Sequence, residues 1–326
     1  MKIGIVGYGN VGRGVEQAIK LNPDAELFAI YTRRDPSEIT PATSGAQVLP
    51  MSALNTRAGG PDVLILCGGS ATDLPEMTPR LAAKYSVVDS FDTHVKVPEH
   101  YSNVQKSTEK GKTVAIISAG WDPGLFSLAR TYMLAAIPSG KTYTFWGTGV
   151  SQGHSDAIRR IDGVADARQY TIPIDEAVTS VRKGENPELT TRQKHKRDCY
   201  VVAKEGADLD AIREQIVNMP NYFADYDTTV TFISQQEMDE KHSEMPHGGS
   251  VIRSGIANEG ATHGSVTEFS LKLDSNPEFT GGVLLACARA AYKMKARGMS
   301  GCFTMLDIAP ADLLPLTKQE ILEKLV

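Results

Sequence analysis

The sequence predicts an α/β protein: a doubly wound parallel sheet, then a second α+β region with a mostly antiparallel sheet. Residues 1–120 alternate short apolar runs with segments of helical spacing, which favours parallel strands covered by helices. After residue 136 the apolar runs become longer and often alternate in polarity, as in antiparallel strands. A glycine-rich turn directly follows the first apolar run. Strand, glycine turn and helix in this order predict a Rossmann-type dinucleotide-binding fold.

The first element is an apolar run at residues 3–6, which ends in Gly7-Tyr8-Gly9-Asn10-Val11-Gly12 and is followed by helical spacing over residues 11–19. In this context Gly7 allows the tight turn, Gly9 lets the backbone approach a pyrophosphate, and Gly12 lets the helix pack against the strand. The amino end of the helix favours negative charge. We therefore expect a dinucleotide to bind at this turn.

The second strand is expected at residues 26–31 and is followed by Thr32-Arg33-Arg34. NAD enzymes place an acidic residue near this point, where it binds the ribose 2′-hydroxyl. A carboxylate would repel a 2′-phosphate, whereas two guanidinium groups and a hydroxyl can hold it. NADP is therefore favoured over NAD. In the alternative interpretation, Arg33 and Arg34 are solvated loop charges and Asp35 binds the ribose.

The alternation continues with strands at residues 62–70, 85–94 and 113–118 and with helices at residues 72–84 and 98–111. Ligands of such sheets bind beyond the carboxyl ends of the strands. Candidates there are Gly68-Gly69-Ser70, Asp92 and the segment 119–124, which contains Asp122. Two carboxylates at adjacent strand ends suit a cationic amine. Alternatively, Asp92 and Asp122 cap the helices that follow them, and their spacing does not decide between the two interpretations.

The second half is expected to contain helices at residues 125–136 and 208–219 and strands at residues 143–147, 169–174, 197–203, 228–233, 249–254 and 265–273. A long helix at residues 276–297 ends at Gly298, and a last strand at residues 303–308 returns to the first domain. We thus predict a dinucleotide-binding domain at residues 1–120, joined by residues 277–326. Residues 121–276 would form a domain for substrate binding and dimerisation.

The composition is that of a globular protein with room for two domains: 326 residues, 41% hydrophobic and 22% charged. A net charge of −5 does not favour a nucleic-acid partner, so a small-molecule substrate is expected. No apolar run reaches the roughly 18 residues of a membrane span and no leader pattern is present, which favours a cytoplasmic protein. The four scattered cysteines lack metal-ligand spacing, so we expect buried free thiols and no metal.

Three polar segments of the second half are candidate binding loops: residues 145–156, the basic run at residues 194–197, and the glycine turn at residues 245–249. The histidines in them are interpreted first as satisfied structural residues, and the basic run as a solvated face.

Taken together, six motifs resemble those of the meso-diaminopimelate dehydrogenase family: Gly-Tyr-Gly-Asn-Val-Gly, Thr-Arg-Arg, Gly-Trp-Asp-Pro-Gly at 120–124, Phe-Trp-Gly-x-Gly-x-Ser-Gln-Gly-His-Ser-Asp at 145–156, His-Lys-Arg at 195–197, and Met-Pro-His-Gly-Gly at 245–249. The resemblance spans nearly the whole chain, and the segment at 145–156 is long and specific. It implies a homodimeric, NADP-dependent oxidoreductase. The implied reaction deaminates the D-centre of meso-2,6-diaminopimelate to L-2-amino-6-oxopimelate, which cyclises to tetrahydrodipicolinate, and the reverse reaction makes a precursor of lysine and the cell wall.

The resemblance also implies roles for individual residues. Around the reacting D-centre it places Asp92, Trp121, Asp122, Trp146, Gln152 and Gly153. Around the remote L-centre it places Thr171, Arg197, His247 and Asn276. The expected cofactor contacts are Gly7, Tyr8, Gly9, Asn10, Val11, Gly12, Thr32, Arg33, Arg34, Cys67, Gly68, Gly69, Ser70, Asp92, Thr93, Gly120 and Trp121.

These roles fit the charges of the substrate, which carries a carboxylate and an ammonium at each end. Arg197 can bind a carboxylate with two hydrogen bonds, and Asp92 and Asp122 can pair with an ammonium or accept its proton. Which group is the catalytic base stays open. Residues 252–266 depart from the family pattern by a short insertion, which makes the role of Asn276 less secure. Two alternatives are a related NADP-dependent oxidoreductase for another D-amino acid or amino alcohol, and a non-catalytic NADP-binding regulator.

Overall fold

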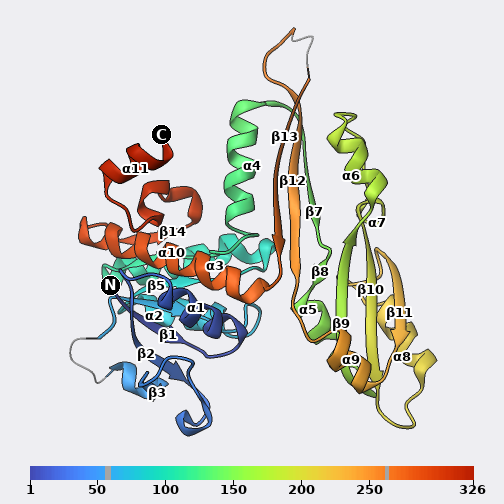
Figure 1. Cartoon of the computed structure of the whole chain (residues 1–326), viewed down its shortest axis with the longest axis horizontal. Coiled ribbons are helices and arrows are strands. Elements are labelled where there is room, and N and C mark those ends of the chain that lie inside the picture. Colours follow the sequence, from blue (N-terminus) through green and yellow to red (C-terminus); the bar gives the residue numbers. More distant parts are fainter. Residues whose placement is uncertain (56–59, 261–263) are drawn as a thin grey trace. The chain divides into compact units, whose positions relative to one another are not determined.

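The structure is a computed structural model that describes residues 1–55, 60–260 and 264–326 (Figure 1). The chain divides into two compact units. Unit 1 comprises Met1–Leu128 and Pro277–Val326, and unit 2 comprises Ala129–Asn276. The first division follows Leu128, whereas the sequence analysis placed the domain boundary after residue 120.

Unit 1 contains a seven-stranded parallel sheet in the order β14-β6-β5-β4-β1-β2-β3. Its strands are β1 (Lys2–Val6), β2 (Glu26–Thr32), β3 (Val48–Pro50), β4 (Val63–Leu66), β5 (Ser86–Asp89), β6 (Val114–Ile116) and β14 (Gly301–Phe303). The central strands are apolar and buried on both faces because helices cover both sides. The predicted doubly wound, Rossmann-type sheet is confirmed.

Side chains of successive strand residues enter two different cores. Ile3, Ile5 and Ile65 pack with residues of α1 (Asn10–Lys20) and α10 (Asn276–Ala296). Leu64 and Leu66 pack with residues of α2 (Leu74–Ala82) and α3 (Val97–Gly111). The period of two along each strand therefore places one pair of helices on each face of the sheet.

Unit 1 differs from the sequence analysis in several details. The strand β3 and the C-terminal helix were not predicted, and the strand expected at residues 85–94 ends at Asp89, with a 3-10 helix at His94–Lys96. The last strand was expected at residues 303–308, but β14 ends at Phe303, and Met305–Asp307 form a 3-10 helix. The expectation was wrong there because Thr304 and Asp307 cap each other's backbone N–H groups, which favours a helical turn. The chain ends in α11 (Lys318–Leu325).

The strands of unit 2 form two sheets rather than the single sheet expected. The three-stranded antiparallel sheet has the order β13-β12-β7 and contains β7 (Ser139–Trp146), β12 (His247–Ile256) and β13 (Ser265–Leu273). The four-stranded sheet has the order β11-β10-β9-β8 and contains β8 (Gly149–Val150), β9 (Val164–Pro173), β10 (His195–Ala203) and β11 (Asp227–Phe232). Most pairs are antiparallel, as predicted, but β10 and β11 are parallel.

Local chemistry explains two features of this arrangement. The parallel pair β10 and β11 is joined by α8 (Leu209–Val217), whose start is capped by the carboxylate of Asp208. The chain leaves the three-stranded sheet at Gly147, where φ is +107° and an added Cβ would lie 2.0 Å from the carbonyl oxygen of Thr171. Only glycine fits at this crossing.

The other α-helices of the described residues between the two segments of unit 1's sheet are α4 (Leu125–Ala136), α5 (Gln152–Arg159), α6 (Asp175–Arg182), α7 (Thr191–Lys194) and α9 (Gln235–Lys241).

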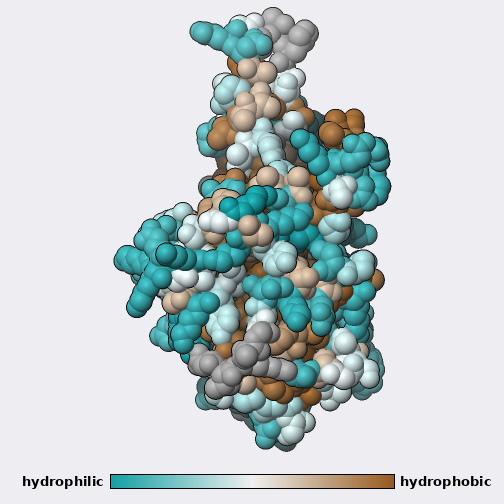
Figure 2. Space-filling model, turned by 90° about the vertical axis from the view of Figure 1, so that its left-hand side faces the viewer, coloured by the Kyte–Doolittle hydropathy of each residue, from teal (hydrophilic) through white to brown (hydrophobic). Residues whose placement is uncertain are grey.

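On the face shown in Figure 2, hydrophilic side chains predominate and hydrophobic atoms are interspersed among them. Among the described residues, no helix is long and apolar enough to cross a membrane. All four cysteines lie in the described ranges and are free thiols, as predicted; Cys199, Cys287 and Cys302 are buried, whereas Cys67 is partly exposed.

Candidate active site

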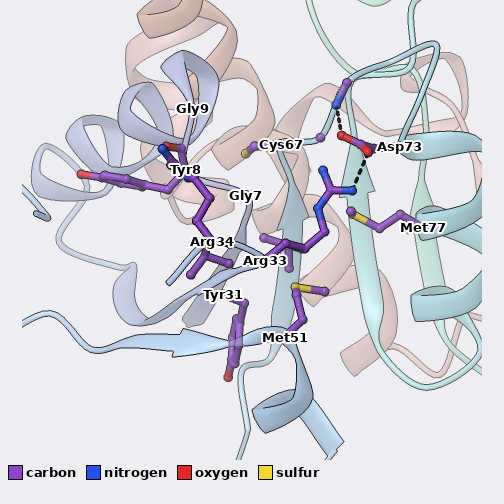
Figure 3. Close-up of a pocket in the computed structure, with 14 residues that line it drawn as sticks. Gly7, Tyr8, Gly9, Tyr31, Arg33, Arg34, Met51, Cys67, Asp73 and Met77 are labelled. Carbon is purple, nitrogen blue, oxygen red and sulfur yellow. Dashed lines mark hydrogen bonds and ion pairs between the residues drawn. The ribbon is translucent and has the colours of Figure 1, made fainter. Parts of the chain in front are cut away.

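Unit 1 contains a cavity of about 290 Å³ at the carboxyl ends of β1, β2 and β4 (Figure 3). This is the edge of a parallel sheet at which ligands bind. Nine of the expected cofactor residues line the cavity: Gly7, Tyr8, Gly9, Thr32, Arg33, Arg34, Cys67, Gly68 and Gly69. Three segments far apart in the sequence are thus brought together, as the sequence predicted.

The glycines of the first turn have the geometry that a dinucleotide requires. Gly7 has φ +90°, which favours glycine, and a Cβ on Gly12 would lie only 2.3 Å from the carbonyl oxygen of Gly7. In contrast, a Cβ on Gly9 would meet no atom within 4 Å. The space above Gly9 is therefore left open for a ligand. Gly9 is also the N-cap of α1 and has no side chain to occupy the N–H groups of the first turn, so a pyrophosphate fits there.

The two arginines after β2 lie at the same cavity. Arg33 is 67% exposed, and its Nη1 lies 2.8 Å from Oδ1 of Asp73 (Figure 3). Arg34 donates a hydrogen bond of 2.7 Å from Nη2 to the carbonyl oxygen of Tyr8. Burial disfavours the charge of Asp73, but the N–H of Gly69 and the guanidinium of Arg33 outweigh it and lower the pKa of this carboxyl. Asp73 holds Arg33 at the cavity wall, a contact that the sequence analysis missed because it treated residues 72–75 only as a helix start.

Replacing Arg33 and Arg34 together with alanine is expected to lower the ratio of kcat/KM for NADP to that for NAD by about tenfold or more, because charge-assisted bonds to the 2′-phosphate are lost. The measurement compares initial rates with both cofactors. Lys106→Ala with Lys110→Ala is the matched control, since it removes the same charge from the exposed side of α3. An unchanged ratio in the arginine variant would contradict the phosphate assignment.

Unit 2 contains a cationic site built on rigid strands. The register places Gly149 of β8 opposite Thr171 of β9, and Thr171 opposite Arg197 of β10. Arg197 is 5% exposed, donates a hydrogen bond from Nη1 to Thr171 Oγ1, and lies over the ring of Tyr226 at 4.0 Å. Its Nε is buried and has no hydrogen-bond partner within the described part of the chain. A buried guanidinium with an unpaired Nε has the chemistry to bind an anion, since an unpaired buried charge is costly.

Two histidines accompany Arg197, and the surroundings of both favour the neutral imidazole. Burial, the charge of Arg197 and His247 together lower the pKa of His154 to about 3. Burial likewise lowers the pKa of His247, and the hydrogen bond to Gly248 opposes this only in part. The Nδ1 of His154 lies 2.7 Å from the hydroxyl of Ser151. Neutral imidazoles can donate hydrogen bonds to a carboxylate while the guanidinium supplies the charge.

Buried histidines make stability depend on pH. Burial and the charges of Arg197 and Lys194 lower the pKa of His195 to about 3, and its Nε2 accepts the backbone N–H of Trp146 at 2.8 Å. The unfolded chain protonates at its ordinary pKa of about 6.5, so His195 contributes stability that is present above that pH and is lost as the pH falls towards 3.

His195→Asn should therefore reduce the dependence of the free energy of unfolding on pH between pH 6 and 5, by about 1 kcal/mol per pH unit. Urea unfolding at several pH values measures it. His94→Asn is the control, because His94 is exposed. Equal slopes for the wild type and His195→Asn would show that His195 is not held neutral.

The strand-end loops of unit 1 carry Asp92, Trp121 and Asp122. The backbone N–H of Asp92 donates to Ser70 Oγ at 2.8 Å, and Trp121 packs edge-on against Phe126 at 5.3 Å. Asp92 is not the N-cap of the helices after it, which are capped at Thr93 and Lys96, so the capping alternative is wrong for this residue.

Three of the predicted contacts in unit 2 lie against Met245 or His195. Gln152 donates from Nε2 to the sulfur of Met245 at 3.1 Å, and the backbone N–H of Asn276 donates to the carbonyl oxygen of Met245 at 3.0 Å. Trp146 stacks on His195 at 5.4 Å. A Cβ on Gly153 would meet nothing within 4 Å. Within the departing segment 252–266, residues 261–263 lie outside the described residues.

The interpretation of His154 as a satisfied structural histidine agrees with its contacts to Ser151 and Phe223. The sequence analysis missed Tyr226, which carried no local signal because it reaches Arg197 only through the pairing of β10 with β11.

A Rossmann-type sheet with an open glycine turn and two arginines after its second strand, accompanied by a separate cationic site, defines an NADP-dependent oxidoreductase. Residues 120–275 match the family model of the diaminopimelic acid dehydrogenase C-terminal domain. The chain is 55% identical over 326 residues to the meso-diaminopimelate D-dehydrogenase of Ureibacillus thermosphaericus, covering 100% of this chain and 99% of that protein.

Two solved structures are similar over the whole chain. The diaminopimelate dehydrogenase of Corynebacterium glutamicum in complex with diaminopimelate has a TM-score of 0.93 at 42% identity, with 100% of this chain and 99% of that one covered. An engineered D-amino acid dehydrogenase bound to NADP⁺ has a TM-score of 0.89 at 40% identity, with the same coverage. The chain belongs to the meso-diaminopimelate D-dehydrogenase family. The family resemblance, the oxidoreductase class and the NADP cofactor expected from the sequence are confirmed.

Proposed function

We propose that this chain oxidises the D-centre of meso-2,6-diaminopimelate with NADP to give L-2-amino-6-oxopimelate, and also catalyses the reverse reductive amination in lysine and cell-wall precursor synthesis. The observation that carries the substrate class is the buried Arg197, whose Nε has no hydrogen-bond partner among the described residues and beside which burial favours the neutral forms of His154 and His247. Such a site suits the carboxylate at the far end of a diacid.

The glycine turn, the residues after β2 and the loop after β4 would hold NADP. The space above Gly9 suits the pyrophosphate, and Arg33 and Arg34 suit the 2′-phosphate. The bound cofactor supplies the hydride acceptor. Further proposed contacts, outside the residues that line the cavity, are Asn10, Val11, Gly12, Ser70, Asp92, Thr93, Gly120 and Trp121.

At the reacting carbon, Asp92 and Asp122 are proposed as catalytic groups, and Trp121, Trp146, Gln152 and Gly153 as further contacts. A carboxylate first pairs with the ammonium and accepts one of its protons, which leaves the amine lone pair free to assist departure of the hydride from carbon. Water then hydrolyses the resulting iminium to the ketone and ammonia.

Stereochemistry would follow from distal binding. Thr171, Arg197, His247 and Asn276 are proposed to hold the L-centre, so that the D-centre is presented in one orientation. Fixing a reactant in this way lowers the activation free energy by several kcal/mol, of the order found for oriented reactions.

A homodimer in the cytoplasm is also proposed. The four free cysteines support a reducing compartment, where thiols stay unpaired. Sedimentation equilibrium measures the oligomeric state, and a monomer at micromolar concentration would contradict the proposed homodimer.

The reaction is tested by following NADPH formation with meso-diaminopimelate, its L,L isomer and simple D-amino acids. The meso form is expected to turn over fastest and the L,L isomer not at all, because only the meso form combines a D-centre with an L-centre. Turnover of the L,L isomer without turnover of the meso form would overturn the stereochemical assignment. Binding of NADP with no turnover of any amino acid would favour the non-catalytic alternative.

A further inference from the structure

Asp89 is a buried carboxylate at the carboxyl end of β5, whereas the sequence analysis placed it inside a strand expected over residues 85–94. Its side chain is 0% exposed. The Oδ1 atom accepts the backbone N–H of Phe91 at 3.1 Å and that of Ser118 at 2.8 Å, and the carbonyl oxygen of Asp89 accepts the N–H of Ala119 at 2.9 Å. One residue therefore binds both the loop after β5 and the loop after β6.

The other carboxylate oxygen, Oδ2, is bound by side chains of the two helices on that face of the sheet. Thr78 of α2 donates from Oγ1 to Oδ2 at 2.7 Å, and Nε2 of His100 of α3 lies 2.7 Å from the same oxygen. The ring of His100 also stacks on Phe91 at 4.2 Å. These contacts fix the rotamer of Asp89 and leave Oδ1 directed at the loops.

The two loops need such a support, because neither backbone segment is stabilised by strand pairing at these points. Ser118 has φ +53°, a left-handed conformation that serine rarely adopts unless its surroundings impose it. Directly after these anchor points come Asp92 in one loop and Trp121 and Asp122 in the other.

We propose that Asp89 is a positioning residue for the reaction: through Oδ1 it fixes the backbone that presents Asp92, Trp121 and Asp122. This inference rests on the proposed function, which gives those three residues the reacting D-centre. An apolar residue at position 89 would leave two buried N–H groups without an acceptor, so the loops would shift to find one. A displacement of about 1 Å at a reacting centre is enough to reduce the rate strongly.

The test compares Asp89→Asn with Asp89→Leu, which are both uncharged and of similar volume. Asparagine keeps an acceptor oxygen in the place of Oδ1, and its amide can donate to Thr78 or His100. Leucine removes every acceptor. With meso-diaminopimelate, kcat is expected to fall about 100-fold in the leucine variant and to stay within about threefold of the wild type in the asparagine variant. The Kd for NADP should stay within about threefold in the asparagine variant and should rise in the leucine variant, because the loops that would shift also carry proposed cofactor contacts.

Thr108→Val is the control for general damage to this core. It removes the hydrogen bond that a buried threonine of α3 donates to the carbonyl oxygen of Gln105 and leaves the contacts of Asp89 in place, so a lower Tm with nearly wild-type kcat is expected. Equal losses of kcat in the asparagine and leucine variants would overturn the proposal, because the charge rather than the acceptor would then matter. A wild-type kcat in the leucine variant would overturn it as well.

Amide hydrogen exchange tests the anchor without reference to activity. In the wild-type protein, the N–H groups of Phe91 and Ser118 are expected to exchange as slowly as strand amides, and in Asp89→Leu peptides covering 90–95 and 117–124 should exchange faster. Exchange of Phe91 and Ser118 at loop rates in the wild type overturns the proposal even if the leucine variant does not fold. If the wild type fails to oxidise meso-diaminopimelate, the proposed function fails, and exchange still decides whether Asp89 holds the loops.

Discussion

Replacing Arg197 with methionine is expected to lower kcat/KM for meso-diaminopimelate by about 100-fold, mainly through KM, which corresponds to about 3 kcal/mol of lost binding. The guanidinium is buried, hydrogen-bonded to Thr171 and stacked on Tyr226, so it is preorganised for a carboxylate. Methionine has similar length but neither charge nor donors. Steady-state kinetics over a range of substrate concentrations measures the effect.

The same substitution should not destabilise the protein. Removing a buried charge whose Nε has no partner in the described structure is expected to leave Tm unchanged or to raise it. Lys196→Met is the matched control, since it removes one positive charge from the exposed face of the same strand. An unchanged KM in Arg197→Met would show that Arg197 does not bind the carboxylate of the L-centre. A large fall in Tm would instead show that the guanidinium mainly supports the fold.

The second large effect is expected at the glycine turn, where one alanine substitution should lower stability and the other should lower the affinity for NADP. A Cβ on Gly12 would lie 2.3 Å from the carbonyl oxygen of Gly7, so Gly12→Ala must move α1 or β1 and should lower the free energy of unfolding by about 2 kcal/mol. A Cβ on Gly9 meets nothing within 4 Å, so Gly9→Ala should fold with the stability of the wild type.

The affinity for NADP separates the two positions further. Gly9→Ala is expected to raise the Kd by about tenfold or more, because the methyl group would occupy the space proposed for the pyrophosphate. Urea unfolding and fluorescence titration measure stability and affinity in each variant. Wild-type affinity in Gly9→Ala would place the pyrophosphate elsewhere, whatever the result for Gly12→Ala.

The elements of unit 1 could be predicted because their signals are local. β1, the glycine turn and α1 lie within twenty residues, and the apolar runs of the central strands mark a sheet covered on both faces. The errors arose where a short polar contact decided the conformation: the mutual capping of Thr304 and Asp307 turned an expected strand into a 3-10 helix. The short β3 was missed because its three residues carry no periodicity.

In the candidate site, too, the residues with local sequence signals were predicted and those that depend on distant partners were not. The glycine turn and the two arginines after β2 were found from the sequence, since each forms a contiguous motif. Asp73 and Tyr226 were not found, and Asp89 was placed inside the strand expected at residues 85–94. Each has a partner at least 29 residues away: Arg33 for Asp73, Arg197 for Tyr226 and the N–H of Ser118 for Asp89.

The sequence by itself determined the fold class, the cofactor turn and the family, because periodicity, turn chemistry and contiguous motifs are properties of short stretches of chain. The tertiary structure alone decided that the strands of unit 2 form two sheets, that Arg197 is buried with an unpaired Nε, and that Asp89 binds two loops. The physical reason is that strand register and burial are set by which distant segments pack together, and side-chain pairing depends on both.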